Sequence, residues 1–163
     1  MPMTEATLDI AIFSIIAGTV AVAFWRGGGP ERAVAIVLLA SFLFQNAGRA
    51  IIPASAHTVD AVRLATDVLL TLSLLLISMR ARRFWPLPVV SMQLIMTGAH
   101  VARAIEVDVS QWSYMLMNTG LSSFMLVLVL VGVKHHQRRL ATFGRDPSWQ
   151  SSWIYSDREM ARR

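Results

Sequence analysis

The sequence of 163 residues contains no cysteine. This absence excludes disulfides, a cysteine nucleophile, cysteine-ligated zinc, iron–sulfur clusters and covalent attachment of a c-type haem. Charge is also scarce, because only 15% of the residues are charged, whereas a soluble domain carries about 25%. There is no glycine-rich phosphate loop, no H-E-x-x-H motif and no paired-carboxylate arrangement. We therefore expect no catalytic residues, no metal ligands and no cofactor, and the composition excludes an ordinary soluble enzyme or a nucleic-acid-binding module.

Apolar residues make up 55% of the sequence, and the mean hydropathy is +0.52. Crossing a hydrocarbon layer of about 30 Å takes about 20 helical residues, and five stretches approach that length. Backbone groups in lipid must be paired within the segment, which favours helices. The sequence therefore predicts an all-α, polytopic integral membrane protein with five transmembrane helices, at about residues 8–25, 33–52, 60–79, 87–105 and 112–133.

Glycine and proline separate the predicted helices. Gly27, Gly28 and Gly29 end the first, Pro30 suits the first turn of the second, and Pro86 restarts the chain before the fourth. We assign residues 1–134 to the bundle and residues 135–163 to a basic, aromatic tail on the cytoplasmic side.

The distribution of basic residues predicts the orientation. Lysine and arginine accumulate on the cytoplasmic side of a membrane. With the N-terminus outside and the C-terminus inside, every basic residue except Arg49, Arg63 and Arg103 lies on the inner side. We expect the bacterial cytoplasmic (inner) membrane, with an anionic inner leaflet that attracts the net charge of +5.

The three basic residues outside this rule lie near the outer ends of their helices, and polar residues recur beside them at helical spacing. Arg63 and Asp67 are four residues apart, and His100 and Arg103 are three apart. Ionisable groups within a membrane span normally face the bundle or a wet cavity. We therefore predict a polar, ligand-binding cluster open to the outer side, formed by Asn46, Arg49, Arg63, Asp67, Gln93, His100, Arg103 and Asn118.

A purely structural interpretation of the same residues stays open. Arg63 and Asp67 form only a local ion pair in this alternative, and the other two arginines reach lipid headgroups. The amides merely hold helices together. A weak internal repeat at an offset of 54 residues, Asn46-x-x-Arg49 against His100-x-x-Arg103, is equally explained by chance.

The inner side carries a second set of residues, which we interpret as contacts to anionic lipid or to a partner protein. Asp146 and Pro147 are expected to begin a short helix with Trp149 and Trp153 on one face. The residues of this docking set are Arg80, Arg82, Arg83, Lys134, Arg138, Arg139, Trp149 and Trp153.

Three functions are consistent with the sequence. The first is a small non-enzymatic membrane protein, an accessory or scaffolding subunit that contacts a protein partner or its own copies. The second is a small oligomeric transporter or binding protein for an anionic or polar ligand, in which Asp67 and His100 exchange protons. The third, an intramembrane enzyme, requires a hydrated Asp67 beside His100.

Overall fold

The computed structural model describes residues 2–51, 61–104 and 111–149, with side chains placed at residue 10 and within 13–48, 62–102 and 120–149. Five helices follow one another: α1 (Pro2–Arg26), α2 (Gly29–Ile51), α3 (Ala61–Arg80), α4 (Pro86–Ala104) and α5 (Gln111–Phe143). The described residues contain no strand, only an isolated antiparallel bridge between Ala81 and Trp149. The prediction of an all-α chain with five helices is confirmed.

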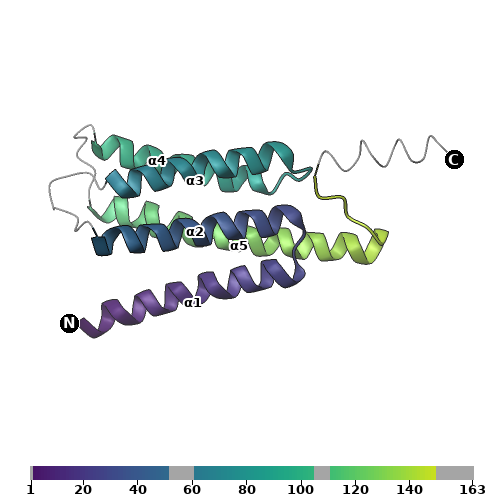
Figure 1. Cartoon of the computed structure of the whole chain (residues 1–163), viewed down its shortest axis with the longest axis horizontal. Coiled ribbons are helices and arrows are strands. Elements are labelled where there is room, and N and C mark those ends of the chain that lie inside the picture. Colours follow the sequence, from purple (N-terminus) through teal and green to yellow (C-terminus); the bar gives the residue numbers. More distant parts are fainter. Residues whose placement is uncertain (1, 52–60, 105–110, 150–163) are drawn as a thin grey trace.

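Each helix runs antiparallel to the next, so the chain forms an up-and-down bundle (Figure 1). α2 packs against α1 and α3, and α3 packs against α4. α5 closes the bundle, since it contacts α1, α2 and α4. With 33 residues and a rise of about 1.5 Å per residue, α5 is about 50 Å long, and its last turns extend beyond the other helices (Figure 1).

Local sequence sets several of the helix ends. The Gly27 amide donates to the Ala23 carbonyl (3.0 Å) and closes the last turn of α1, where a side chain on Gly27 would collide with that carbonyl. Gly144 ends α5 with a φ of 69°, and its amide donates to the Leu140 carbonyl (2.9 Å). A left-handed residue at this position is a common helix stop that favours glycine.

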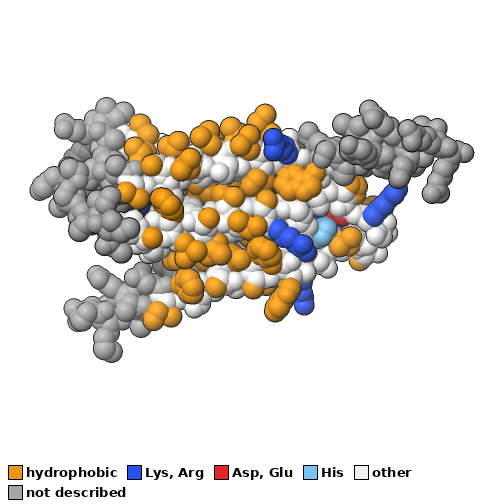
Figure 2. Space-filling view, in the orientation of Figure 1, with side chains coloured by type: hydrophobic (Ala, Val, Ile, Leu, Met, Phe, Trp, Pro, Cys, Tyr) orange, Lys and Arg blue, Asp and Glu red, His pale blue; other side chains and the backbone are white. Residues whose placement is uncertain are grey.

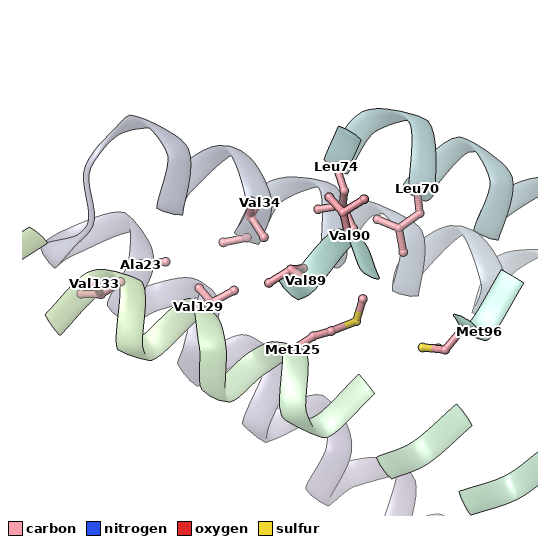
Figure 3. Packing of buried hydrophobic residues seen from close by; sticks show 11 residues of the cluster. Ala23, Val34, Leu70, Leu74, Val89, Val90, Met96, Met125, Val129 and Val133 are labelled. Carbon is pink, nitrogen blue, oxygen red and sulfur yellow. The ribbon is translucent and has the colours of Figure 1, made fainter. Parts of the chain in front are cut away.

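The apolar core lies between the helices. Val34 of α2, Leu74 of α3, Val89 of α4 and Val129 of α5 are almost completely buried, and their side chains point toward one another in Figure 3. These residues join the helices in a single hydrophobic cluster.

One helix among the described residues, Val62–Arg80, is long and apolar enough on its own to cross a membrane. Phe13–Arg26 is a shorter apolar helix. The predicted helices are therefore present, but the prediction that all five cross the membrane is not confirmed.

Candidate functional site: two buried polar clusters

The first polar cluster surrounds Asp67, whose side chain is 3% exposed. Its Oδ1 accepts hydrogen bonds from Gln45 Nε2 (3.2 Å) and Gln93 Nε2 (3.4 Å). Its Oδ2 lies 2.9 Å from Nε2 of His100. We call these four residues the Asp67 cluster; they join α2, α3 and α4.

A pair of threonines extends this cluster by one helical turn. Thr71 follows Asp67 by four residues on α3, and Thr97 follows Gln93 by four residues on α4, so both hydroxyls lie on the facing sides of the two helices. The hydroxyl oxygens of Thr71 and Thr97 are 2.9 Å apart. Each hydroxyl also contacts the carbonyl four residues earlier on its own helix. The polar contact between α3 and α4 therefore continues toward the middle of the bundle.

Part of the predicted outer site converges here, and part does not. Asp67, Gln93 and His100 are buried together inside the bundle, while their role as a ligand-binding site stays a prediction. Asn46 needs a correction: its side chain is exposed, and its amide donates to the Phe42 carbonyl of the same helix (2.8 Å). The adjacent Gln45 faces Asp67 instead.

Of the other four residues predicted for this site, the structure places the side chain of Arg63. Arg63 is half-buried one turn from Asp67 on α3. The side chains of Arg49, Arg103 and Asn118 lie outside the described set, so the meeting of three arginines stays a prediction.

The second cluster lies at the opposite end of the bundle, around Arg83. This residue belongs to the α3–α4 connection, and its side chain is 2% exposed. Its Nη1 forms an ion pair with Glu31 of α2, a carboxylate whose side chain is 0% exposed. The Trp85 indole Nε1 donates to the same Glu31 oxygen (3.0 Å). A buried guanidinium is thus joined to a buried carboxylate 52 residues away in sequence.

The opposite edge of the Arg83 guanidinium meets the segment that follows α5. Nη2 donates to Asp146 Oδ2 (2.7 Å) and to the Ser148 hydroxyl (3.2 Å). His136 of α5 places Nδ1 2.7 Å from the same Asp146 oxygen. Glu31, Arg83, Trp85, His136, Asp146 and Ser148 together make up what we call the Arg83 cluster.

The glycine tract allows the chain after α5 to approach this closely. A methyl group on Gly29 would collide with the Trp149 indole. A methyl group on Gly28 would lie 3.0 Å from His136 Cε1 and 3.1 Å from Arg83 Nη2. Besides breaking the helix, these glycines therefore leave room for the returning segment.

The structure corrects two expectations for the inner side. Arg83 is buried in ion pairs, so its guanidinium does not face headgroups or a partner. Asp146 and Pro147 lie in irregular chain and begin no helix within the described residues, and the Asp146 carboxylate binds Arg83 instead. Trp149 is half-buried beside Gly29, and its role in docking stays a prediction.

Four other members of the docking set lie at the surface. Arg80, Arg82, Lys134 and Arg138 are exposed, and Arg139 is half-buried. Trp153 lies outside the described residues.

The two clusters are separated by the hydrophobic core. On α2, Glu31 and Gln45 are 14 residues apart, which corresponds to about 21 Å along a helix. Val34, Leu74, Val89 and Val129 fill the bundle between them. Each cluster therefore lies at its own end of the bundle.

The chemistry available in these clusters is hydrogen bonding, charge pairing and proton exchange. The described residues contain no group of three or more histidine, cysteine, aspartate or glutamate side chains that could hold a metal ion. Comparison with known proteins gives no match to a family model, a curated protein or a solved structure.

Proposed function

We propose that this chain is an integral membrane protein whose five helices all cross the bilayer. The observation that carries the proposal is the distribution of polarity across the bundle. Every helix exposes large apolar side chains, among them Phe13 (48%), Phe44 (65%), Leu69 (62%), Leu94 (54%) and Phe124 (55%). Charged and amide side chains lie inside instead, such as Glu31, Asp67 and Gln93. Exposed apolar surface on this scale requires a lipid or protein neighbour.

The surface charge supports an orientation with the N-terminus outside and the C-terminus inside. Figure 2 shows hydrophobic side chains along the helices and basic side chains gathered toward the end where α1 turns into α2. Exposed basic residues at this end include Arg26, Arg80, Lys134 and Arg138. Exposed Trp25 (87%) beside them suits a membrane interface. We place this end at the anionic inner leaflet of a bacterial cytoplasmic membrane.

Cysteine labelling tests the orientation directly, because the natural chain has no cysteine of its own. A cysteine replacing Arg138 is expected to react with an impermeant maleimide only after the cells are opened. A cysteine replacing His57 is expected to react in intact cells. Labelling with the opposite sidedness, or of both positions from one side, would contradict the five crossings or their direction.

Within the membrane we propose a non-enzymatic role, as an accessory or scaffolding subunit of a membrane complex. The polar groups that could carry chemistry already bind one another. The Asp67 carboxylate receives donors from α2 and α4, and Arg83 joins Glu31 to Asp146. Interhelical contacts of this kind stabilise a bundle, and the apolar exterior remains available to another subunit or a second copy of the chain.

Co-purification tests this role. The full chain, extracted from its native membrane in mild detergent, is expected to migrate with a larger protein or as a homo-oligomer of defined stoichiometry. Substitution of exposed Phe44 and Leu69 by alanine is expected to weaken that association, whereas the control change Thr142→Ala, at another exposed side chain, is not. A chain that elutes as a monomer under conditions that preserve other complexes of that membrane would refute it.

A second function is favoured by one observation, the 2.9 Å contact between Asp67 and His100. An ionisable pair within a membrane span is a common element of proton relays. In this alternative the chain is a small transporter or binding protein for an anionic or polar ligand. Proteoliposomes would then take up a labelled anion in a proton-dependent manner, and Asp67→Asn would abolish uptake. Equal uptake by Asp67→Asn and the natural chain would exclude it.

A further inference from the structure

The Asp146 carboxylate occupies a socket built by other parts of the chain. Its Oδ2 lies 2.7 Å from Arg83 Nη2, 2.7 Å from His136 Nδ1 and 3.4 Å from Arg139 Nε. Arg83 is fixed by Glu31, while His136 and Arg139 belong to α5. We call Arg83, His136 and Arg139 the basic socket. Three nitrogen groups therefore converge on one oxygen of a residue that lies in irregular chain.

The formal charges around the basic socket indicate that it favours an anion. The two positive charges of Arg83 and Arg139 balance the two negative charges of Glu31 and Asp146. Glu31 holds the far edge of the guanidinium through Nη1, so it leaves the edge at Nη2 free for another acceptor. Without Asp146 the Nη2 edge of Arg83, whose side chain is 2% exposed, would lose its carboxylate acceptor, and a buried donor without an acceptor is unfavourable. The socket therefore favours an anion.

Outside the socket, few backbone contacts hold the segment around Asp146 in place. The Arg82 amide donates to the Ser148 carbonyl at a long 3.4 Å, and one isolated bridge joins Ala81 to Trp149. The chain from residue 145 to residue 148 has no regular structure. A stronger anion can thus replace this carboxylate without unfolding a helix.

We propose that the basic socket binds a phosphate group, and that Asp146 is a built-in competitor that fills the socket in the unliganded chain. A phosphate monoester carries about −1.5 to −2 charges and three strong acceptor oxygens, against one charge for the carboxylate. Arginine and histidine are suitable donors for such a group. Gly28, whose added methyl group would lie within about 3 Å of the socket, lets the backbone at the start of α2 approach the anion.

The ligand is a phosphate group, either on a phospholipid headgroup or free in solution. This inference goes beyond the scaffolding role and does not depend on it, since co-purification and phosphate binding are measured separately. When phosphate binds, Asp146 leaves and the segment with Ser148 and Trp149 lifts from Gly29.

Cysteine reactivity measures this release. Ser148→Cys is introduced into the full chain in phosphatidylcholine vesicles, with exposed Arg138→Cys as the matched control. Inorganic phosphate, or phosphatidic acid in part of the vesicle lipid, is expected to speed maleimide labelling at position 148 by about tenfold, which corresponds to about 1.4 kcal/mol. The rate at position 138 is expected to stay constant after correction for the surface potential.

Each outcome decides the proposal. Faster labelling with phosphatidic acid alone identifies a headgroup, and faster labelling with free phosphate identifies a soluble ligand. Phosphatidylglycerol, a phosphodiester, tests for general attraction to anionic lipid. An equal acceleration by phosphatidylglycerol, or no acceleration by either phosphate source, overturns the proposal.

A second variant keeps the test independent of Ser148. Asp146→Ala is expected to lower the unfolding temperature of the full chain, and added phosphate is expected to restore it. Asp146→Ala combined with His136→Gln should lose most of this restoration. If phosphate stabilises Asp146→Ala no more than the natural chain, the socket does not bind phosphate.

Discussion

Replacing Glu31 by glutamine tests the centre of the Arg83 cluster. The substitution keeps the size of the side chain and removes its charge. Both partners are almost completely buried, at 0% for Glu31 and 2% for Arg83, and loss of one partner of a buried pair costs about 3–5 kcal/mol. Asp146 remains bound to Arg83, and the glutamine carbonyl still accepts from Trp85. We therefore expect a loss of about 2–3 kcal/mol in the free energy of unfolding.

The reverse substitution, Arg83→Gln, is expected to cost more, about 4–5 kcal/mol, because it leaves the carboxylates of both Glu31 and Asp146 without their guanidinium. The double variant should be more stable than the sum of the two single losses predicts, by about 1–3 kcal/mol, since the two residues are in direct contact.

The assay is reversible unfolding of the full chain in mixed micelles, followed by the loss of helical circular dichroism as dodecyl sulfate is added. Exposed Arg80→Gln serves as the control and should stay within about 0.5 kcal/mol of the natural chain. Additive single losses, or a Glu31→Gln variant as stable as the control, would refute the buried ion pair.

Two further substitutions follow from the described contacts. Gly29→Ala should destabilise the bundle by about 1–3 kcal/mol, because the new methyl group overlaps the Trp149 indole. The control Gly18→Ala, whose new methyl group meets nothing within 4 Å, should instead stabilise α1 by about 0.5–1 kcal/mol. Equal effects of the two substitutions on thermal unfolding would contradict this placement of the indole. Asp67→Ala should lower the free energy of unfolding by about 1–3 kcal/mol, because it leaves the buried donors around Asp67 without an acceptor. Asp67→Asn retains a carbonyl acceptor and should lower it less in the same mixed-micelle assay. Equal losses would indicate that the carboxylate accepts no buried hydrogen bonds.

Much of the helical organisation follows from local sequence. Glycine at residues 27–29 and proline at residues 30 and 86 set chain reversals near the predicted positions. The inward placement of Asp67, Gln93 and His100 follows from the cost of polar groups in an apolar surrounding. The far end of α5 was predicted less well: apolar length suggests an end near residue 133, but the helix continues to Phe143. The polar residues after 133 still favour helix, and His136 packs into the Arg83 cluster.

The residues were misassigned for two different physical reasons. Asn46 and Gln45 are neighbours on α2, so a rotation of about 100° per residue decides which amide faces Asp67, and spacing alone did not distinguish them. Arg83 belongs to a basic run, which is typical of a membrane surface. Its buried partners Glu31 and Asp146 lie 52 and 63 residues away, and no local pattern indicates that the chain brings them together.

The separation of the two clusters has an electrical consequence. In the proposed orientation, the bundle holds fixed charge near each leaflet and a layer of low polarisability between them, at Val34, Leu74, Val89 and Val129. Two charged layers are thus separated by a layer of low dielectric constant. Most of a transmembrane voltage would fall across this aliphatic layer, in which none of the described side chains is charged. In the scaffolding role, the folded chain should therefore be insensitive to voltage and should leave the resistance of the bilayer intact.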